Sequence, residues 1–162
     1  SLRALAALPE ELRRRCMYVV VGRDRAAPFR RLARSLDLAG QVRFIGGRHD
    51  VADLMQAADL LLHPAYSESA GYALLEAVVS GLPVLTTASC GYAFHVSAAE
   101  AGQVCAEPFD QLKLNKMLHQ MLSEAQLANW SKNGIAYGQQ TELYGMADRA
   151  VDLIEAVAGE LA

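Results

Sequence analysis

The sequence predicts an α/β fold in which a parallel sheet carries helices on both of its faces. Short apolar runs, which are typical of buried strands, alternate along the chain with segments whose apolar residues recur at helical spacing. This alternation favours parallel strands joined by right-handed crossovers. The chain has 162 residues, of which 52% are apolar, so it can bury one core and form a single domain.

The first half of the chain contains two predicted strands and three predicted helices. Leucines recur at helical spacing between Leu2 and Leu12. Pro28 suits the first turn of a helix, and Asp50 is the expected N-cap of another. In chain order, the elements are a helix over 2–14, a strand over 17–21, a helix over 28–38, a strand over 42–45 and a helix over 50–57.

The second half continues the alternation and then becomes helical. Gly71 is expected at the start of a helix and Gly81 at its end. The predicted elements are a strand over 59–63, a helix over 71–80, strands over 84–87 and 103–105, and a helical tail over 110–162, in three segments broken near Ser123 and Gly138. We therefore predict one Rossmann-like domain over 1–162 that includes its helical tail.

A doubly wound domain normally begins with a strand, whereas this chain opens on a predicted helix. We expect the first strand and the loop after it to lie upstream, so that the domain is truncated at its N-terminus. In such a sheet, the ligand lies outside the carboxyl ends of the strands. The loops expected at those ends are 22–24, 46–48, 63–68 and 86–91.

Composition argues against several classes of protein. The net charge of −3 gives no support for nucleic-acid binding, and the arginine runs 13–15 and 30–31 are interpreted as solvated helix faces rather than a phosphate-binding stripe. Three cysteines without a CxxC pair favour a reducing compartment. No apolar run reaches membrane-spanning length, so we expect a cytoplasmic protein.

The stretch from Glu68 to Glu76 carries the strongest functional signal. Glu68 lies in a predicted loop, and Glu76 lies in a predicted helix whose other residues are almost all apolar. Such a helix is expected to be buried, where an ionised carboxylate is costly unless it is paired. Glu76 is therefore expected to have a partner, either the hydroxyl groups of a ligand or an arginine of a neighbouring helix.

The two glutamates belong to a longer ordered string that includes Phe44-Ile-Gly46, Asp50-Val and Gly81-Leu-Pro83. This string resembles the family 4 retaining glycosyltransferases of the GT-B fold over residues 18–84, with a weaker match through Pro108. The segments 60–66 and 85–92 are similar to members that glucosylate the lipopolysaccharide core. GT-B enzymes have two Rossmann-like domains, and the resemblance places this chain in the C-terminal, donor-binding domain, without the N-terminal acceptor domain.

The resemblance implies roles for individual residues. Glu76 would accept hydrogen bonds from the ribose hydroxyls, Glu68 would orient the transferred hexose as the candidate catalytic residue, and Arg48 would lie beside the uracil. The amides that would bind the diphosphate at the helix start belong to Ser69, Ala70, Gly71 and Tyr72. Alternatively, Glu68 is a solvated loop residue and Arg48 a surface residue near Asp50. The segment Cys90 to His95 departs from the family's Gly-Gly-x-x-Glu pattern, and no donor contact is assigned to it.

The implied reaction is transfer of glucose from UDP-glucose to a heptose of the lipopolysaccharide inner core with retention of configuration. The resemblance implies no cofactor and no metal ion, because an upstream Arg and Lys and the helix amides would neutralise the diphosphate. The isolated chain is expected to be inactive, and the full-length enzyme to work at the inner face of the bacterial inner membrane. Two alternatives stay open: another nucleotide-sugar donor, or a non-catalytic nucleotide-binding or interaction module.

Overall fold

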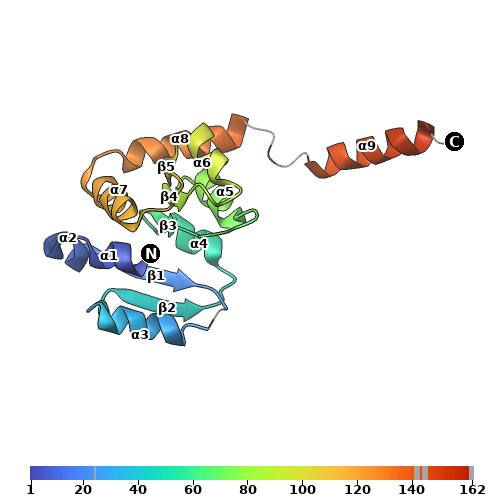
Figure 1. The fold of residues 1–162 in the computed structure, drawn as a ribbon. Helices are drawn as coiled ribbons and strands as arrows, with labels where there is room; N and C mark the ends of the chain where they lie inside the picture. Colours follow the sequence, from blue (N-terminus) through green and yellow to red (C-terminus); the bar gives the residue numbers. More distant parts are fainter. Residues whose placement is uncertain (24, 141–142, 144–145, 161–162) are drawn as a thin grey trace.

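The computed structural model describes residues 1–23, 25–140, 143 and 146–160, so Asp24 of the predicted loop 22–24 lies outside the described residues. The described residues form an α/β fold with parallel strands and helices on both sides of them (Figure 1). The strands are β1 (Tyr18–Val21), β2 (Val42–Gly46), β3 (Leu61–His63), β4 (Val84–Thr87) and β5 (Gly102–Cys105). The helices are α1 (Leu2–Ala6), α2 (Glu10–Arg15), α3 (Ala27–Ser35), α4 (Val51–Gln56), α5 (Tyr72–Val79), α6 (Ala93–Ala98), α7 (Gln111–Ser123), α8 (Leu127–Gln140) and α9 (Met146–Glu160).

The strands form two parallel sheets instead of the single sheet that the sequence predicts. β1 pairs with β2, and β3, β4 and β5 pair in that order. The doubly wound fold has the strand order 3-2-1-4-5-6. In that order, β2 and β1 correspond to positions 3 and 2, and β3, β4 and β5 correspond to positions 4, 5 and 6. No strand of the described residues fills the central position, so β1 and β3 each keep one open edge. The prediction of parallel strands is confirmed, and the gap at the central position accounts for the division into two sheets.

Alternate residues of the three-stranded sheet enter two different apolar clusters. Leu62, Leu85 and Cys105 face a cluster that contains α1 and α7. Their neighbours Leu61, Val84 and Val104 face a second cluster that contains α5 and α6. This period of two is what a strand buried on both faces requires, and it confirms the prediction that helices cover both faces.

Two predicted boundaries are wrong for local reasons, and one predicted N-cap residue lacks its side-chain bond to the helix. The predicted helix over 2–14 is two helices, because Pro9 adopts an extended conformation and becomes the N-cap of α2. Asp50 is the N-cap residue of α4, but its side chain bonds to Arg48 instead of to the helix. The tail has three helices as predicted, yet Gly138 lies inside α8, which ends at Gln140. The helix α6 is absent from the prediction.

The tail helices differ in how they contact the rest of the molecule. α7 packs against α1 and β5, and α8 packs against α5. A Cβ atom on Gly134 would lie 2.4 Å from the carbonyl oxygen of Val78, so glycine lets α8 approach the α5 backbone closely. Figure 1 shows α9 apart from the other helices.

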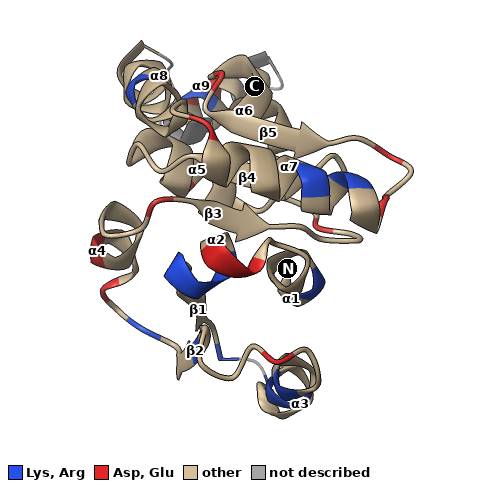
Figure 2. Ribbon diagram, turned by 90° about the vertical axis from the view of Figure 1, so that its left-hand side faces the viewer, with Lys and Arg blue, Asp and Glu red and all other residues tan. Residues whose placement is uncertain are grey.

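The two arginine runs lie on α2 and α3, where Figure 2 shows bands of Lys and Arg. Arg14, Arg15, Arg30 and Arg31 are exposed. Arg14 pairs with Glu10 of the same helix, and Arg30 donates a hydrogen bond to the Phe44 carbonyl oxygen at 3.0 Å. The fifth arginine of the two runs, Arg13, is half-buried and donates a hydrogen bond to the Ala6 carbonyl oxygen at 3.2 Å.

Candidate functional site

The loops that follow β3 and β4 run side by side at the carboxyl ends of these strands. The backbones of Glu68 and Cys90 form an isolated parallel bridge. The Gly91 amide donates to the Glu68 carbonyl oxygen at 3.0 Å, and the Tyr92 amide donates to the Ala70 carbonyl oxygen at 2.7 Å. These bonds fix the backbone that carries Glu68, so the structure brings together two loops whose bridged residues, Glu68 and Cys90, are 22 positions apart in the sequence.

Gly91 is required by this close approach. A Cβ atom at position 91 would lie 2.1 Å from the carbonyl oxygen of Ser69, far inside any real contact. The sequence analysis assigns no donor contact to the segment that contains this glycine. Its function is to let one loop touch the other, which is a contact between distant segments that no local pattern records.

Hydroxyl groups of β4 and its loop hold the first residues of the Glu68 loop. The Ala65 amide donates to Thr87 Oγ1 at 3.0 Å, and the Ser89 hydroxyl donates to the Ala65 carbonyl oxygen at 2.5 Å. Thr86 Oγ1 donates to the His63 carbonyl oxygen at 2.9 Å. Thr86 and Thr87 are buried, so these bonds replace the water that the loop backbone would otherwise need.

Gly71 ends the loop and starts α5. It is the N-cap residue and has a φ of 83°, a left-handed conformation that favours glycine. A Cβ atom there would lie 3.4 Å from Glu68 Cγ, which shows that the Glu68 side chain packs over this corner. Ser69, Ala70, Gly71 and Tyr72 therefore form the turn into α5, as the sequence analysis expects, and Glu68 is half-buried beside it.

The observed environment of Glu76 differs from the one that the sequence analysis expects. The sequence analysis expects it on a helix that is buried all round, whereas α5 buries only Leu74, Ala77 and Val78. Glu76 is exposed and lies one turn after Tyr72, which is exposed as well. The helix is apolar by composition but packs on one side only, so the expected desolvation of Glu76 is wrong. Among the residues that the structure describes, no hydrogen bond or ion pair involves its carboxylate.

Arg48 follows β2 in the other sheet and forms a two-point ion pair with Asp50. Its Nε and Nη2 atoms lie 2.8 Å and 2.6 Å from the two Asp50 carboxylate oxygens. The hydrogen bond from Arg48 lowers the pKa of the Asp50 carboxyl, and both side chains are exposed. Within the described part of the chain, no hydrogen bond or ion pair joins Arg48 to the Glu68 loop.

An aromatic cluster that the sequence analysis does not identify adjoins the Glu68 loop. Tyr72 begins α5, Tyr92 precedes α6, and Phe94 and His95 lie in the first turn of α6. The rings of Tyr72 and Tyr92 meet edge to face at 5.3 Å, and His95 Nδ1 lies 2.8 Å from the Tyr137 hydroxyl of α8. Burial lowers the pKa of His95. The packing of α5 against α6 and α8 brings Tyr72 and Tyr137 to the rings at the start of α6, so no local spacing in the sequence predicts the cluster.

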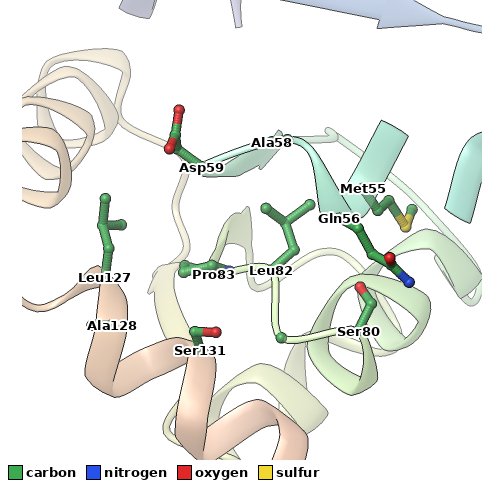
Figure 3. Close-up of a pocket in the computed structure, with 11 residues that line it drawn as sticks. Met55, Gln56, Ala58, Asp59, Ser80, Leu82, Pro83, Leu127, Ala128 and Ser131 are labelled. Atoms are coloured by element: carbon green, nitrogen blue, oxygen red, sulfur yellow. The ribbon is translucent and has the colours of Figure 1, made fainter. Parts of the chain in front are cut away.

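A cavity of about 310 Å³ opens at the opposite edge of the three-stranded sheet, near the amino ends of β3 and β4. Figure 3 shows Asp59, Ser80 and Ser131 around it, with Leu82 and Pro83 between them. It contains none of the sequence-predicted residues. In doubly wound sheets, ligands bind at the carboxyl ends, so the loops of Glu68 and Gly91 remain the candidate site.

Two other features, a metal-binding cluster and a membrane-spanning helix, are absent from the described residues. No three His, Cys, Asp or Glu side chains of residues 1–23, 25–140, 143 and 146–160 gather closely enough to hold a metal ion. Over the same residues, none of the helices has the length and apolar character that crossing a membrane requires.

Comparison with known proteins gives consistent matches. The sequence model of the family described as "Glycosyl transferases group 1" matches residues 1–137. The chain is 48% identical over 155 residues to the lipopolysaccharide glucosyltransferase WaaG of Escherichia coli K12, covering 95% of this chain and 41% of that protein. The crystal structure of WaaG superposes with a TM-score of 0.90 over 94% of this chain and 42% of that one.

A more distant match supports the fold. The structure of Anabaena HepE in complex with UDP-glucose superposes with a TM-score of 0.78 at 22% sequence identity, over 96% of this chain and 44% of that one. The chain thus spans about two-fifths of the length of these three relatives.

Proposed function

Because this chain belongs to the group 1 glycosyl transferases, we propose that it is the donor-binding domain of a retaining enzyme that transfers glucose from UDP-glucose to a heptose of the lipopolysaccharide inner core. The observation that carries the proposal is the 48% identity to the lipopolysaccharide glucosyltransferase WaaG over nearly the whole chain. HepE, whose structure is a UDP-glucose complex, shares the fold. In this proposal, the rest of the enzyme supplies an N-terminal domain that binds the acceptor, at the inner face of the inner membrane.

The donor would lie across the paired loops after β3 and β4. The amides of Ser69, Ala70, Gly71 and Tyr72 would face the diphosphate at the start of α5, where the helix dipole favours negative charge. The bonds from Gly91 and Tyr92 hold that turn in place before the donor arrives. Such preorganised donors stabilise charge that builds on a departing phosphate.

The two glutamates would hold the sugar rings of the donor. Glu68 is half-buried against Gly71 and would accept hydrogen bonds from hydroxyls of the transferred hexose, which orients its anomeric carbon. Glu76 is exposed and carries no recorded partner among the described residues, so its carboxylate is available to the ribose hydroxyls. Arg48 would lie beside the uracil while Asp50 holds its guanidinium in place.

The reaction would proceed on one face of the sugar. As the bond from the anomeric carbon to the diphosphate oxygen breaks, the leaving diphosphate would take the proton of the acceptor hydroxyl, whose oxygen forms the new bond. The residues of this chain position the donor and need not exchange protons themselves. Because half of the cleft would belong to the rest of the enzyme, the isolated chain would bind the donor weakly and transfer nothing.

The test uses the longer enzyme with Glu76→Ala. We expect UDP-glucose affinity to fall at least tenfold, which corresponds to about 1.4 kcal/mol and is modest for hydrogen bonds to a charged group. Glu11→Ala is the matched control, because Glu11 is an exposed glutamate of α2. Unchanged donor affinity and turnover in Glu76→Ala would contradict the proposed role.

A second measurement identifies the base. Titration of the isotope-labelled chain with UDP, UDP-glucose, ADP-glucose and GDP-mannose should shift the backbone amides from Glu68 to Glu76 with the uridine ligands alone. Shifts with adenosine or guanosine ligands only would replace UDP-glucose as the donor and leave the site in place.

A further inference from the structure

We propose that Tyr72, Tyr92 and Phe94 form an aromatic surface that binds a sugar ring of the saccharide acceptor. This inference rests on the proposed transferase function and deepens it, because it assigns part of acceptor recognition to this domain. Its basis is the position, exposure and rigidity of the three rings and the charge around them.

Two of the three rings are presented to solvent, and Tyr92 is half-buried against the apolar cluster of α5 and α6. Tyr72 is 66% exposed and Phe94 is 58% exposed. Tyr92 lies between them, with ring centroids 5.3 Å from Tyr72 and 6.3 Å from Phe94, and both pairs meet nearly edge to face. Three adjoining rings at the surface leave a large apolar area in water, which is typical of a binding surface.

Contacts on the protein side of the aromatic cluster hold its rings in place, so binding a ligand would fix few additional side-chain torsions. The His95 ring lies against Phe94 with centroids 3.9 Å apart, and His95 Nδ1 lies 2.8 Å from the Tyr137 hydroxyl. Hydrogen bonding between the Tyr92 hydroxyl and Tyr72 raises the pKa of the Tyr92 hydroxyl. The Tyr92 amide donates to the Ala70 carbonyl oxygen. Aromatic side chains have few torsions to fix, and these contacts fix most of them in advance.

The surface adjoins the end of the donor site where the sugar would lie. Tyr72 immediately follows the turn at Gly71, and the Tyr92 backbone bonds to Ala70, two residues after Glu68. A sugar that lies on these rings would therefore reach the loop that we propose to hold the transferred hexose. This continuity favours the acceptor as the occupant of the surface.

The charge near the surface also suits a saccharide. The sequence has no Lys or Arg between Arg48 and Lys113, a range that contains every ring of the cluster except Tyr137. An anionic membrane surface or a nucleic acid would require cations there. The phenol hydroxyls instead offer hydrogen bonds to a hydroxyl-rich ligand, while the ring faces cover its C–H groups.

The test compares two phenylalanines of similar exposure in the longer enzyme. Phe94→Ala should raise the KM for heptose-terminated lipopolysaccharide core about tenfold, as loss of one aromatic contact implies, and leave the KM for UDP-glucose within about twofold. Phe29→Ala, at a 53% exposed position on α3, should change neither value. An unchanged acceptor KM in Phe94→Ala, or an equal rise in both KM values, would overturn the inference.

Two further measurements separate a failed inference from other failures. Phe94→Leu keeps the apolar volume without a ring, and full recovery of the acceptor KM would overturn ring stacking as the basis of recognition. Urea unfolding of each purified variant shows whether it is folded before its kinetics are compared. If the unchanged enzyme transfers no glucose from UDP-glucose, the proposed function itself fails. If the unchanged enzyme does transfer glucose and Phe94→Ala has an unchanged acceptor KM, only the inference fails.

Discussion

The Thr87 hydroxyl and the Ala65 backbone are joined by two hydrogen bonds in opposite directions. The hydroxyl donates to the Ala65 carbonyl oxygen at 2.7 Å and accepts from the Ala65 amide at 3.0 Å. The side chain of a buried residue at the end of β4 thus replaces a backbone partner for the loop that follows β3. The position of Glu68, three residues further along, depends on this anchor.

Thr87→Val should destabilise the chain although it preserves the shape of the side chain. It leaves the Ala65 amide and carbonyl without the Thr87 hydroxyl in a protected site, which costs about 1–3 kcal/mol in the free energy of unfolding. Thr87→Ser keeps the hydroxyl and should recover most of this loss. Urea unfolding of the three proteins measures the difference, and equal stability of Thr87→Val and the unchanged chain would contradict the anchoring role.

Gly91→Ala should separate the two loops of the candidate site. The new methyl group would meet the Ser69 carbonyl oxygen, so the loops must move apart, at a cost of about 1–3 kcal/mol for forced overpacking. Gly40→Ala is the control, since a Cβ atom there has no neighbour within 4 Å. Unfolding free energies and the amide shifts of residues 68–71 measure the effect. Equal stabilities of the two variants would show that the loops do not need glycine.

Gly134→Ala sets two effects of opposite sign against each other. Alanine improves helix propensity by about 1 kcal/mol, which should stabilise α8. Its methyl group, however, would press on the Val78 carbonyl oxygen of α5, where backbone cannot move aside cheaply. We expect the second effect to dominate, with a lower melting temperature than the unchanged chain. A higher melting temperature would mean that α5 and α8 are less closely packed.

His95 should make stability depend on pH. Burial lowers its pKa in the folded state, so the unfolded state binds the proton more tightly. The contribution of His95 to stability is therefore complete above the unfolded pKa of about 6.5 and is lost as the pH falls through the lower folded pKa. His95→Gln should reduce the loss of unfolding free energy between about pH 7.5 and about pH 5.5. An identical pH dependence in both proteins would exclude His95 as its source.

Much of the fold could be predicted because each element is encoded locally. The apolar runs that contain Leu62 and Leu85 indicate buried strands, and Gly71 and Gly81 bound α5 as expected. The run 17–21 also forms a strand, but its predicted burial is wrong, because Met17, Val19 and Val21 are exposed. The split between α1 and α2 was missed because the leucine spacing continues through Pro9. The gap between β1 and β3 could not be found locally, because strand order depends on pairing between distant segments.

The candidate site was predictable only in part. The turn from Glu68 to Gly71 could be located because glycine and carboxylate occur in a recognisable order. The burial of Glu76 was misjudged, since composition cannot tell whether a helix packs on one side or on all sides. The contact between Gly91 and Ser69 and the ring cluster around Tyr92 arise from long-range packing, for which a single sequence holds no signal.

The open edges of β1 and β3 divide the molecule into two cooperative units. Among the described residues, no ladder of hydrogen bonds connects the β1–α3–β2 unit to the three-stranded sheet, and both contribute side chains to one apolar cluster. The smaller unit also exposes Val19, Val21 and Ile45. Sub-global opening of this unit should therefore require less free energy than unfolding of β4, and in hydrogen exchange the Val20 amide should exchange before the Leu85 amide.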